Sequence, residues 1–147
     1  MGVAVDLLDG VVAKLNETTF GSATVSRGFI IEVARKGLST PEISVCLDSK
    51  ESFEIDRGNE CLKYTVAVGL HYPTTSDADL DLGMDMLEDI QDWLSDRSNR
   101  AIVTSSGTFK LHHPVALEAP LDATMAREMN CYYSVITLPY LFYKVRN

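Results

Sequence analysis

The chain has 147 residues, of which 46% are hydrophobic and 23% are charged. This length suits one domain, and this composition excludes a disordered chain. The formal net charge of −8, with the lysines and arginines scattered, argues against a protein that binds nucleic acid through a dense basic surface.

The cysteines and the apolar segments bear on where the protein resides. Cys46, Cys61 and Cys131 show no short paired spacing, which indicates buried thiols of a reducing compartment rather than a disulfide framework. The N-terminal segment contains two aspartates and no charged leader, so no signal peptide is expected. The longest apolar run, residues 131–143, is too short to cross a bilayer as a helix. We therefore expect a soluble protein made in the cytoplasm, with no membrane partner.

The first third of the chain predicts a helix followed by two strands. Residues 3–15 place apolar side chains at helical spacing, namely Val5, Leu8, Val11, Val12 and Leu15. Gly10 weakens this helix slightly without overturning it. Residues 28–34 and 42–48 alternate apolar and polar side chains, as half-buried strands do.

The clearest strand of the sequence follows at residues 62–72. Its apolar positions alternate strictly, at Leu62, Tyr64, Val66, Val68, Leu70 and Tyr72. Pro73 ends it. The stretch from Ser49 to Asn59 is polar and contains a glycine, which predicts a long hairpin arm. Two strands joined only by such an arm are expected to pair antiparallel.

A second helix is expected to begin after Ser76, whose hydroxyl caps it together with Asp79 as a variant of the capping box. Arg97 is placed in the last turn, where positive charge suits the helix dipole. One apolar stripe runs along the helix at Leu80, Gly83, Met84, Leu87, Ile90 and Leu94.

The last third predicts two short strands at residues 101–103 and 108–111, a connector at 117–130, and a closing strand at 132–143. Pro139 is expected to make the far half of that closing strand an edge or a bulge. The order of elements predicts an α+β fold in a single domain spanning residues 1–147. We expect one mixed, mainly antiparallel β-sheet of about four strands, with two helices packed on one face.

The second helix is acidic and invites a calcium-site hypothesis. Asp77, Asp79 and Asp81, with Asp85 and Glu88, follow the ligand spacing of a calcium loop. The sixth position of such a loop requires glycine, however, and here it is leucine. The apolar stripe also continues through the segment, which a coordination loop would interrupt. A solvated acidic helix face is therefore the preferred interpretation, and it would aid solubility, repel DNA or meet a basic partner.

Other chemistry has weaker support in the sequence. His112 and His113 are adjacent, so on a strand they point to opposite faces and do not chelate one ion together. A composite site of His71 with Cys46 and Cys61 has no compact motif behind it. The nucleophile elbow, the phosphate loop and the zinc-protease helix are missing from the sequence. We expect no catalytic residue, no metal and no cofactor, and hence no enzyme.

Six segments recur in a characteristic order along the chain. They are an opening helix at 7–15, a valine-containing strand end at 43–45, an arm with an arginine at 55–57, an alternating strand at 64–70, residues 113–117, and the closing strand at 133–138. This order and spacing resemble the tail terminator and related minor tail or tail-completion proteins of long-tailed bacteriophages. The likeness covers nearly the whole chain and has no single specific motif. The double histidine and the internal Pro139 depart from the family pattern.

This resemblance implies a structural virion protein near the head-tail junction, assembled in the host cytoplasm. It implies a ring of identical subunits, expected to be a hexamer, that caps the head-proximal end of the tail tube. Its partners would be its own copies, the tail tube protein and a neck or connector protein, and DNA would pass through the lumen without specific binding. Another head-tail joining component is the nearest alternative, and a cellular small-molecule-binding domain is a more distant one.

The expected working surfaces follow from this reading. Contact with a neighbouring subunit is assigned to Arg57, Glu54 and Lys50 of the arm, and to Trp93 as an aromatic anchor on the second helix. Trp93 has a second reading, as part of a deeply buried helix. The acidic surface, placed at the lumen or the outer wall, is assigned to Asp81, Asp85, Glu88, Asp89 and Asp92.

Overall fold

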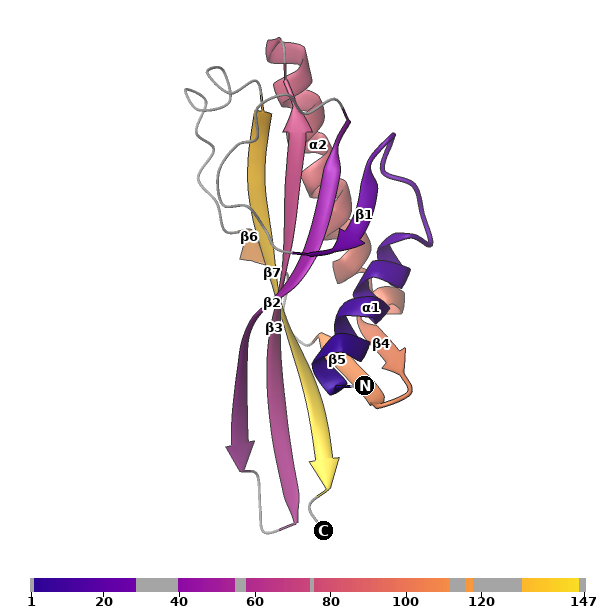
Figure 1. Cartoon of the computed structure of the whole chain (residues 1–147), viewed down its shortest axis with the longest axis vertical. Coiled ribbons are helices and arrows are strands. Elements are labelled where there is room, and N and C mark those ends of the chain that lie inside the picture. Colours follow the sequence, from indigo (N-terminus) through magenta and orange to yellow (C-terminus); the bar gives the residue numbers. More distant parts are fainter. Residues whose placement is uncertain are drawn as a thin grey trace.

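The computed structural model of the chain describes residues 2–28, 40–54, 58–74, 76–111, 116–117 and 131–145 (Figure 1). Its helices are α1 (Val3–Leu15), α2 (Asp77–Ser95) and the short 3-10 helix η1 (Arg97–Asn99). Its strands are β1 (Thr24–Arg27), β2 (Glu42–Glu54), β3 (Asn59–Pro73), β4 (Ala101–Thr104), β5 (Gly107–Leu111), β6 (Ala116–Leu117) and β7 (Cys131–Val145).

The strands form one mixed sheet in the order β1-β2-β3-β7-β5-β4, with β6 added beside β7. β1 lies parallel to β2, and the other pairs are antiparallel. The α+β class and the mainly antiparallel sheet are therefore confirmed, but the expected number of about four strands is wrong, because six strands lie in the main path alone. The strand expected at 28–34 lies outside the described residues except for Gly28.

The long central strands meet along their apolar faces. Leu62, Tyr64, Val66, Val68 and Leu70 are all buried, as the alternation predicted. Their β7 partners in register are Phe142, Tyr140, Leu138, Ile136 and Ser134. Because residues directly opposite each other in an antiparallel pair point to the same face, this register builds one continuous apolar surface. Both helices pack on that surface.

Helix α1 begins and ends where its sequence predicted. It contacts β1, β2 and β4, which include the strands at both ends of the sheet, so the sheet curls around it (Figure 1). A Cβ atom on Gly10 would overlap Cγ2 of Ile102 on β4. The glycine that weakens the helix locally therefore allows the close approach of α1 to the far end of the sheet.

Helix α2 starts as expected, because the Ser76 hydroxyl accepts a hydrogen bond from the backbone N–H of Asp79 at 3.3 Å. Gly83 packs against Tyr132 and Tyr72, and a Cβ there would lie 2.9 Å from Cδ1 of Tyr132. The expected place of Arg97 in the last turn is wrong. The helix ends at Ser95, and Asp96 caps η1, which contains Arg97.

Of the two alternatives expected at Pro139, the bulge does not form, since β7 stays in continuous register with β3 from Cys131 to Val145. On its other side, β7 pairs with β6 as far as Thr137 and with β5 at Tyr140 and Leu141, and past Leu141 it is an edge among the described residues, which was the other alternative. Pro139, which has no N–H to donate, therefore lies between these two short pairings. The irregularity of the sheet occurs instead in β2, between Leu47 and Ser49.

Candidate functional site

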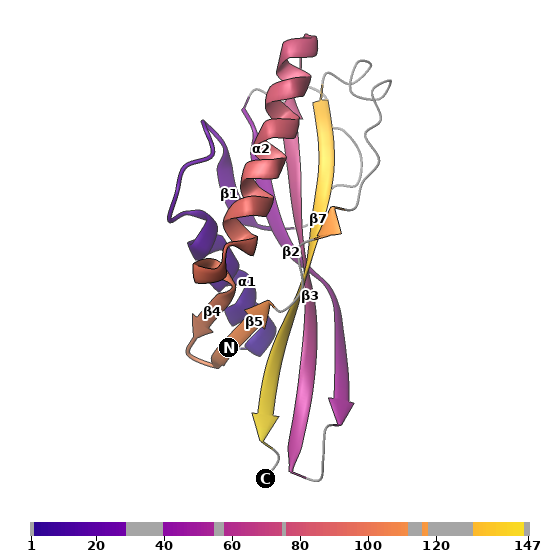
Figure 2. The ribbon, with the colours of Figure 1, turned by 180° about the vertical axis from the view of Figure 1, so that it is seen from behind.

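The most prominent feature of the sheet is an arm made from the ends of three strands. The sequence predicted a hairpin at 49–59, and β2 and β3 do continue as a paired hairpin through that region. β7 adds a third strand, because it pairs with β3 as far as Asn59 and Val145. Figures 1 and 2 show this arm extending past α1 and the β4–β5 hairpin. We refer to Asp48–Glu54 of β2, Asn59–Thr65 of β3 and Pro139–Val145 of β7 as the arm.

The shift between Leu47 and Ser49 changes which side chains of β2 face the helices. Before it, Ile43 and Val45 face the core and are fully buried. After it, Lys50 lies opposite Tyr64. The Lys50 ammonium lies 5.4 Å from the centroid of the Tyr64 ring, a cation–π geometry. The bulge thus replaces apolar side chains by polar ones where the strand leaves the core.

The four residues assigned to subunit contact lie in different parts of the structure. Lys50 is exposed on the arm, and Glu54 is the last residue of β2. Arg57 lies outside the described residues. Trp93 lies on α2 and not on the arm.

Trp93 is half-buried and joins the two helices. Its indole Nε1 donates a hydrogen bond to the carbonyl oxygen of Lys14 at 2.9 Å, and its own carbonyl accepts one from Nδ2 of Asn99, also at 2.9 Å. The residue therefore fixes the end of α2 to the end of α1, a role that neither of its two sequence readings included.

The acidic residues of α2 form a solvated face, as the preferred interpretation had it. Asp81, Asp85, Glu88, Asp89 and Asp92 are all exposed. Residues 77–95 are one continuous helix, so the segment with calcium-loop spacing does not form a coordination loop.

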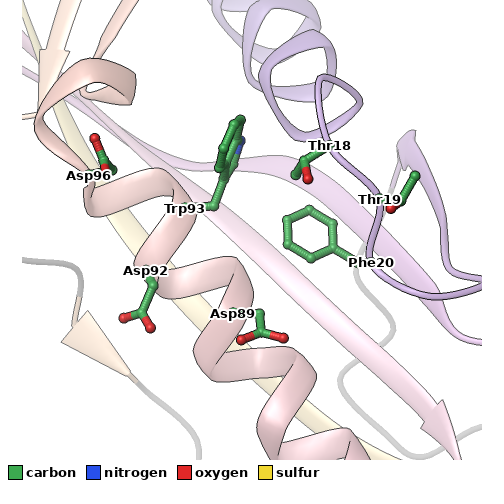
Figure 3. Close-up of a pocket in the computed structure, with 7 residues that line it drawn as sticks. All are labelled: Thr18, Thr19, Phe20, Asp89, Asp92, Trp93 and Asp96. Carbon is green, nitrogen blue, oxygen red and sulfur yellow. The ribbon is translucent and has the colours of Figure 1, made fainter.

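An open depression of about 390 Å³ lies between this acidic face and the segment that follows α1 (Figure 3). Hydrogen bonds from the hydroxyl and the backbone N–H of Ser98 hold the pKa of the Asp96 carboxyl below its usual value. Sequence reasoning missed this depression, because it joins segments about 70 residues apart. Its lining residues are Thr18, Thr19, Phe20, Asp89, Asp92, Trp93 and Asp96.

The composite histidine and cysteine site does not assemble. His71 is buried near one end of β3, while Cys61 lies ten positions away toward the other end. A strand rises about 3.3 Å per residue, which separates these two by roughly 30 Å. Cys61 is buried as expected, Cys46 is only half-buried, and neither forms a disulfide. His112 and His113, and the side chain of Cys131, lie outside what the structure describes. Within the described ranges, no three histidine, cysteine or acidic side chains gather as metal ligands would.

The chain matches no model of a known protein family and no curated protein sequence. No helix of the described part combines the length and the apolar character that crossing a bilayer requires.

Proposed function

We propose that the chain is a structural subunit of a long-tailed phage, a tail terminator whose copies form a ring at the head-proximal end of the tail tube. The observation that carries this proposal is the three-stranded arm. It extends past the helices (Figures 1 and 2). The residues from Asp48 to Ser52 on its β2 strand are all exposed. Tyr64 and Tyr140 join the base of the arm to the core. The exposed β2 strand of the arm, however, has no neighbouring strand on its outer side among the described residues, and a neighbouring subunit supplies one.

The acidic helix face supports the same proposal. α2 presents five exposed carboxylates and carries no lysine or arginine over its length. Negative charge at this density repels the phosphate backbone. In a ring through which DNA passes, this face would keep the duplex from adhering, whether it lines the lumen or lies at its rim.

The proposal is tested by assembly and capping. Purified protein should form a closed oligomer of defined mass by size exclusion with light scattering, and electron microscopy should show it at one end of tail tubes whose growth has stopped. A protein that stays monomeric at all concentrations and leaves tube length unchanged would contradict the proposal, as would turnover of a substrate.

A further inference from the structure

Among the described residues, no strand lies on the outer side of β2 along the arm. β1 pairs with β2 only from Glu42 to Val45, and the last bond of that pair runs from the N–H of Gly28 to the carbonyl of Val45 at 3.0 Å. β2 then continues to Glu54. No other strand of the described residues pairs with this side of β2, and Asp48–Ser52 is exposed throughout. Such a strand presents a row of backbone N–H and C=O groups that can pair with another chain.

The opposite edge of the arm is formed by β7. β5 pairs with β7 at Tyr140 and Leu141, and β7 continues past it to Val145. β2 and β7 are each antiparallel to β3, so they run in the same direction. If copies are placed side by side around an axis along the arm, the end of β7 of one copy lies parallel to β2 of the next.

We propose that β2 of the arm, from Asp48 to Glu54, docks the end of β7 of a second copy of this chain, so that the sheet continues from one subunit into the next. This inference rests on the proposed function and names the contact that would build its ring. The two surfaces are different, so the contact is heterologous, and a heterologous contact closes into a ring when its rotation allows. Main-chain hydrogen bonds supply the contact, as in other cases of strand addition.

Charge complementarity favours the end of β7 of a second copy, rather than β2 of a second copy, as the strand that docks on β2. The β2 segment carries Asp48, Glu51 and Glu54 against the single Lys50. Residues 131–147 contain no acidic residue and end with Lys144 and Arg146 in the sequence. Pairing β2 with β2 of another copy would bring like charges together, whereas pairing it with the end of β7 brings opposite charges together.

Two adjacent proline substitutions test the edge. Successive N–H groups of a strand point to opposite sides of the strand. One of the two variants, Glu51→Pro or Ser52→Pro, therefore removes a hydrogen bond to β3, and the other removes only an N–H group at the outer edge of β2. The variant that changes only the outer edge should unfold at the same temperature as the wild type, and thermal unfolding identifies it in this way. That variant should associate at least tenfold more weakly than the wild type by light scattering. Ser52→Thr, which keeps the N–H and favours a strand, should assemble normally.

A charge swap provides a test that does not depend on proline. Glu54 and Lys144 lie at the same level of the arm, because each is paired with Glu60. Glu54→Lys should weaken assembly, Lys144→Glu should weaken it as well, and the double variant should recover a large part of the loss.

The outcomes separate this inference from the proposed function. Normal assembly of the stable proline variant, or no recovery in the charge swap, overturns the strand contact and leaves the ring proposal standing. Oligomers that form through the arm but never cap tubes contradict the proposed function alone. A protein that forms only a twofold dimer, in which β2 of one copy pairs with β2 of the other, overturns the proposal that β2 docks the end of β7.

Discussion

The indole of Trp93 and the carbonyl of Lys14 form a hydrogen bond of 2.9 Å between residues 79 positions apart in the sequence. This bond joins the ends of α1 and α2, which otherwise contact each other at few points. Lys14 is in the last turn of α1, where carbonyl groups lack helical partners. Its carbonyl also accepts from the N–H of Glu17 at 3.3 Å, so the indole is its second donor.

Trp93→Phe should therefore destabilise the protein by about 1 kcal/mol or more, because it removes the N–H donor together with part of the indole ring. Trp93→Ala should cost more, since it also removes the packing of the ring against the end of α1. Urea denaturation followed by circular dichroism measures both. A Trp93→Phe variant as stable as the wild type would mean that the bond contributes nothing.

Gly10→Ala should destabilise the fold although alanine is the better helix former. In an exposed helix this change stabilises by about 1 kcal/mol. Here the new Cβ overlaps Cγ2 of Ile102, and overpacking of this kind costs about 1–3 kcal/mol. The thermal midpoint should fall accordingly.

The control for this prediction is a double-mutant cycle with Ile102→Ala, which removes the clashing atom. In that background Gly10→Ala should become neutral or stabilising. An equal loss in both backgrounds would assign the effect to something other than the contact between α1 and β4.

The sequence predicted those elements in which apolar side chains repeat with the period of a helix or a strand, because one face of the element is buried. α1 has the bounds that its apolar spacing gave, and β3 alternates as expected, because each has one face in the core. β1 went undetected, since among Thr24–Arg27 only Val25 is even half-buried, and its position depends on parallel pairing with β2. The pattern of apolar residues within one segment carries no information about which distant strand that segment pairs with.

The candidate site was predictable to a similar degree. The arm followed from the polar stretch between two strands, and the acidic face of α2 from its composition. The closing strand was predicted, but its place as the third strand of the arm was missed, because its pairing with β3 joins segments far apart in the sequence. The depression beside Trp93 and the bond to Lys14 depend on how α2 crosses the end of α1, which no local pattern specifies.

Tyr140→Phe should leave the protein as stable as the wild type or stabilise it by up to about 1 kcal/mol. Tyr140 is fully buried between Tyr64 and Leu111, and its hydroxyl has no hydrogen-bond partner among the described residues. Removing a buried hydroxyl that makes no bond removes its desolvation cost.

Denaturation at pH 7 measures this effect, and Tyr140→Leu is the matched variant that also loses the ring. The leucine variant should lose about 2 kcal/mol or more, because its smaller side chain leaves a gap in the core. A clear loss of stability in Tyr140→Phe itself would reveal a partner of the hydroxyl.

The same tyrosine should make the protein sensitive to alkaline pH. Burial raises the pKa of Tyr140 above its ordinary value of 10, and burial also raises the pKa of Tyr132. Above pH 10 the unfolded chain loses these phenolic protons while the folded chain retains them. The folded state then binds more protons, so the free energy of unfolding falls as the pH rises.

Urea titrations between pH 8 and pH 11 measure this dependence. The free energy of unfolding should change little through these groups below about pH 9 and should decline steeply above pH 10. Tyr140→Phe should make that decline shallower, whereas an unchanged slope would show that Tyr140 ionises equally well in both states.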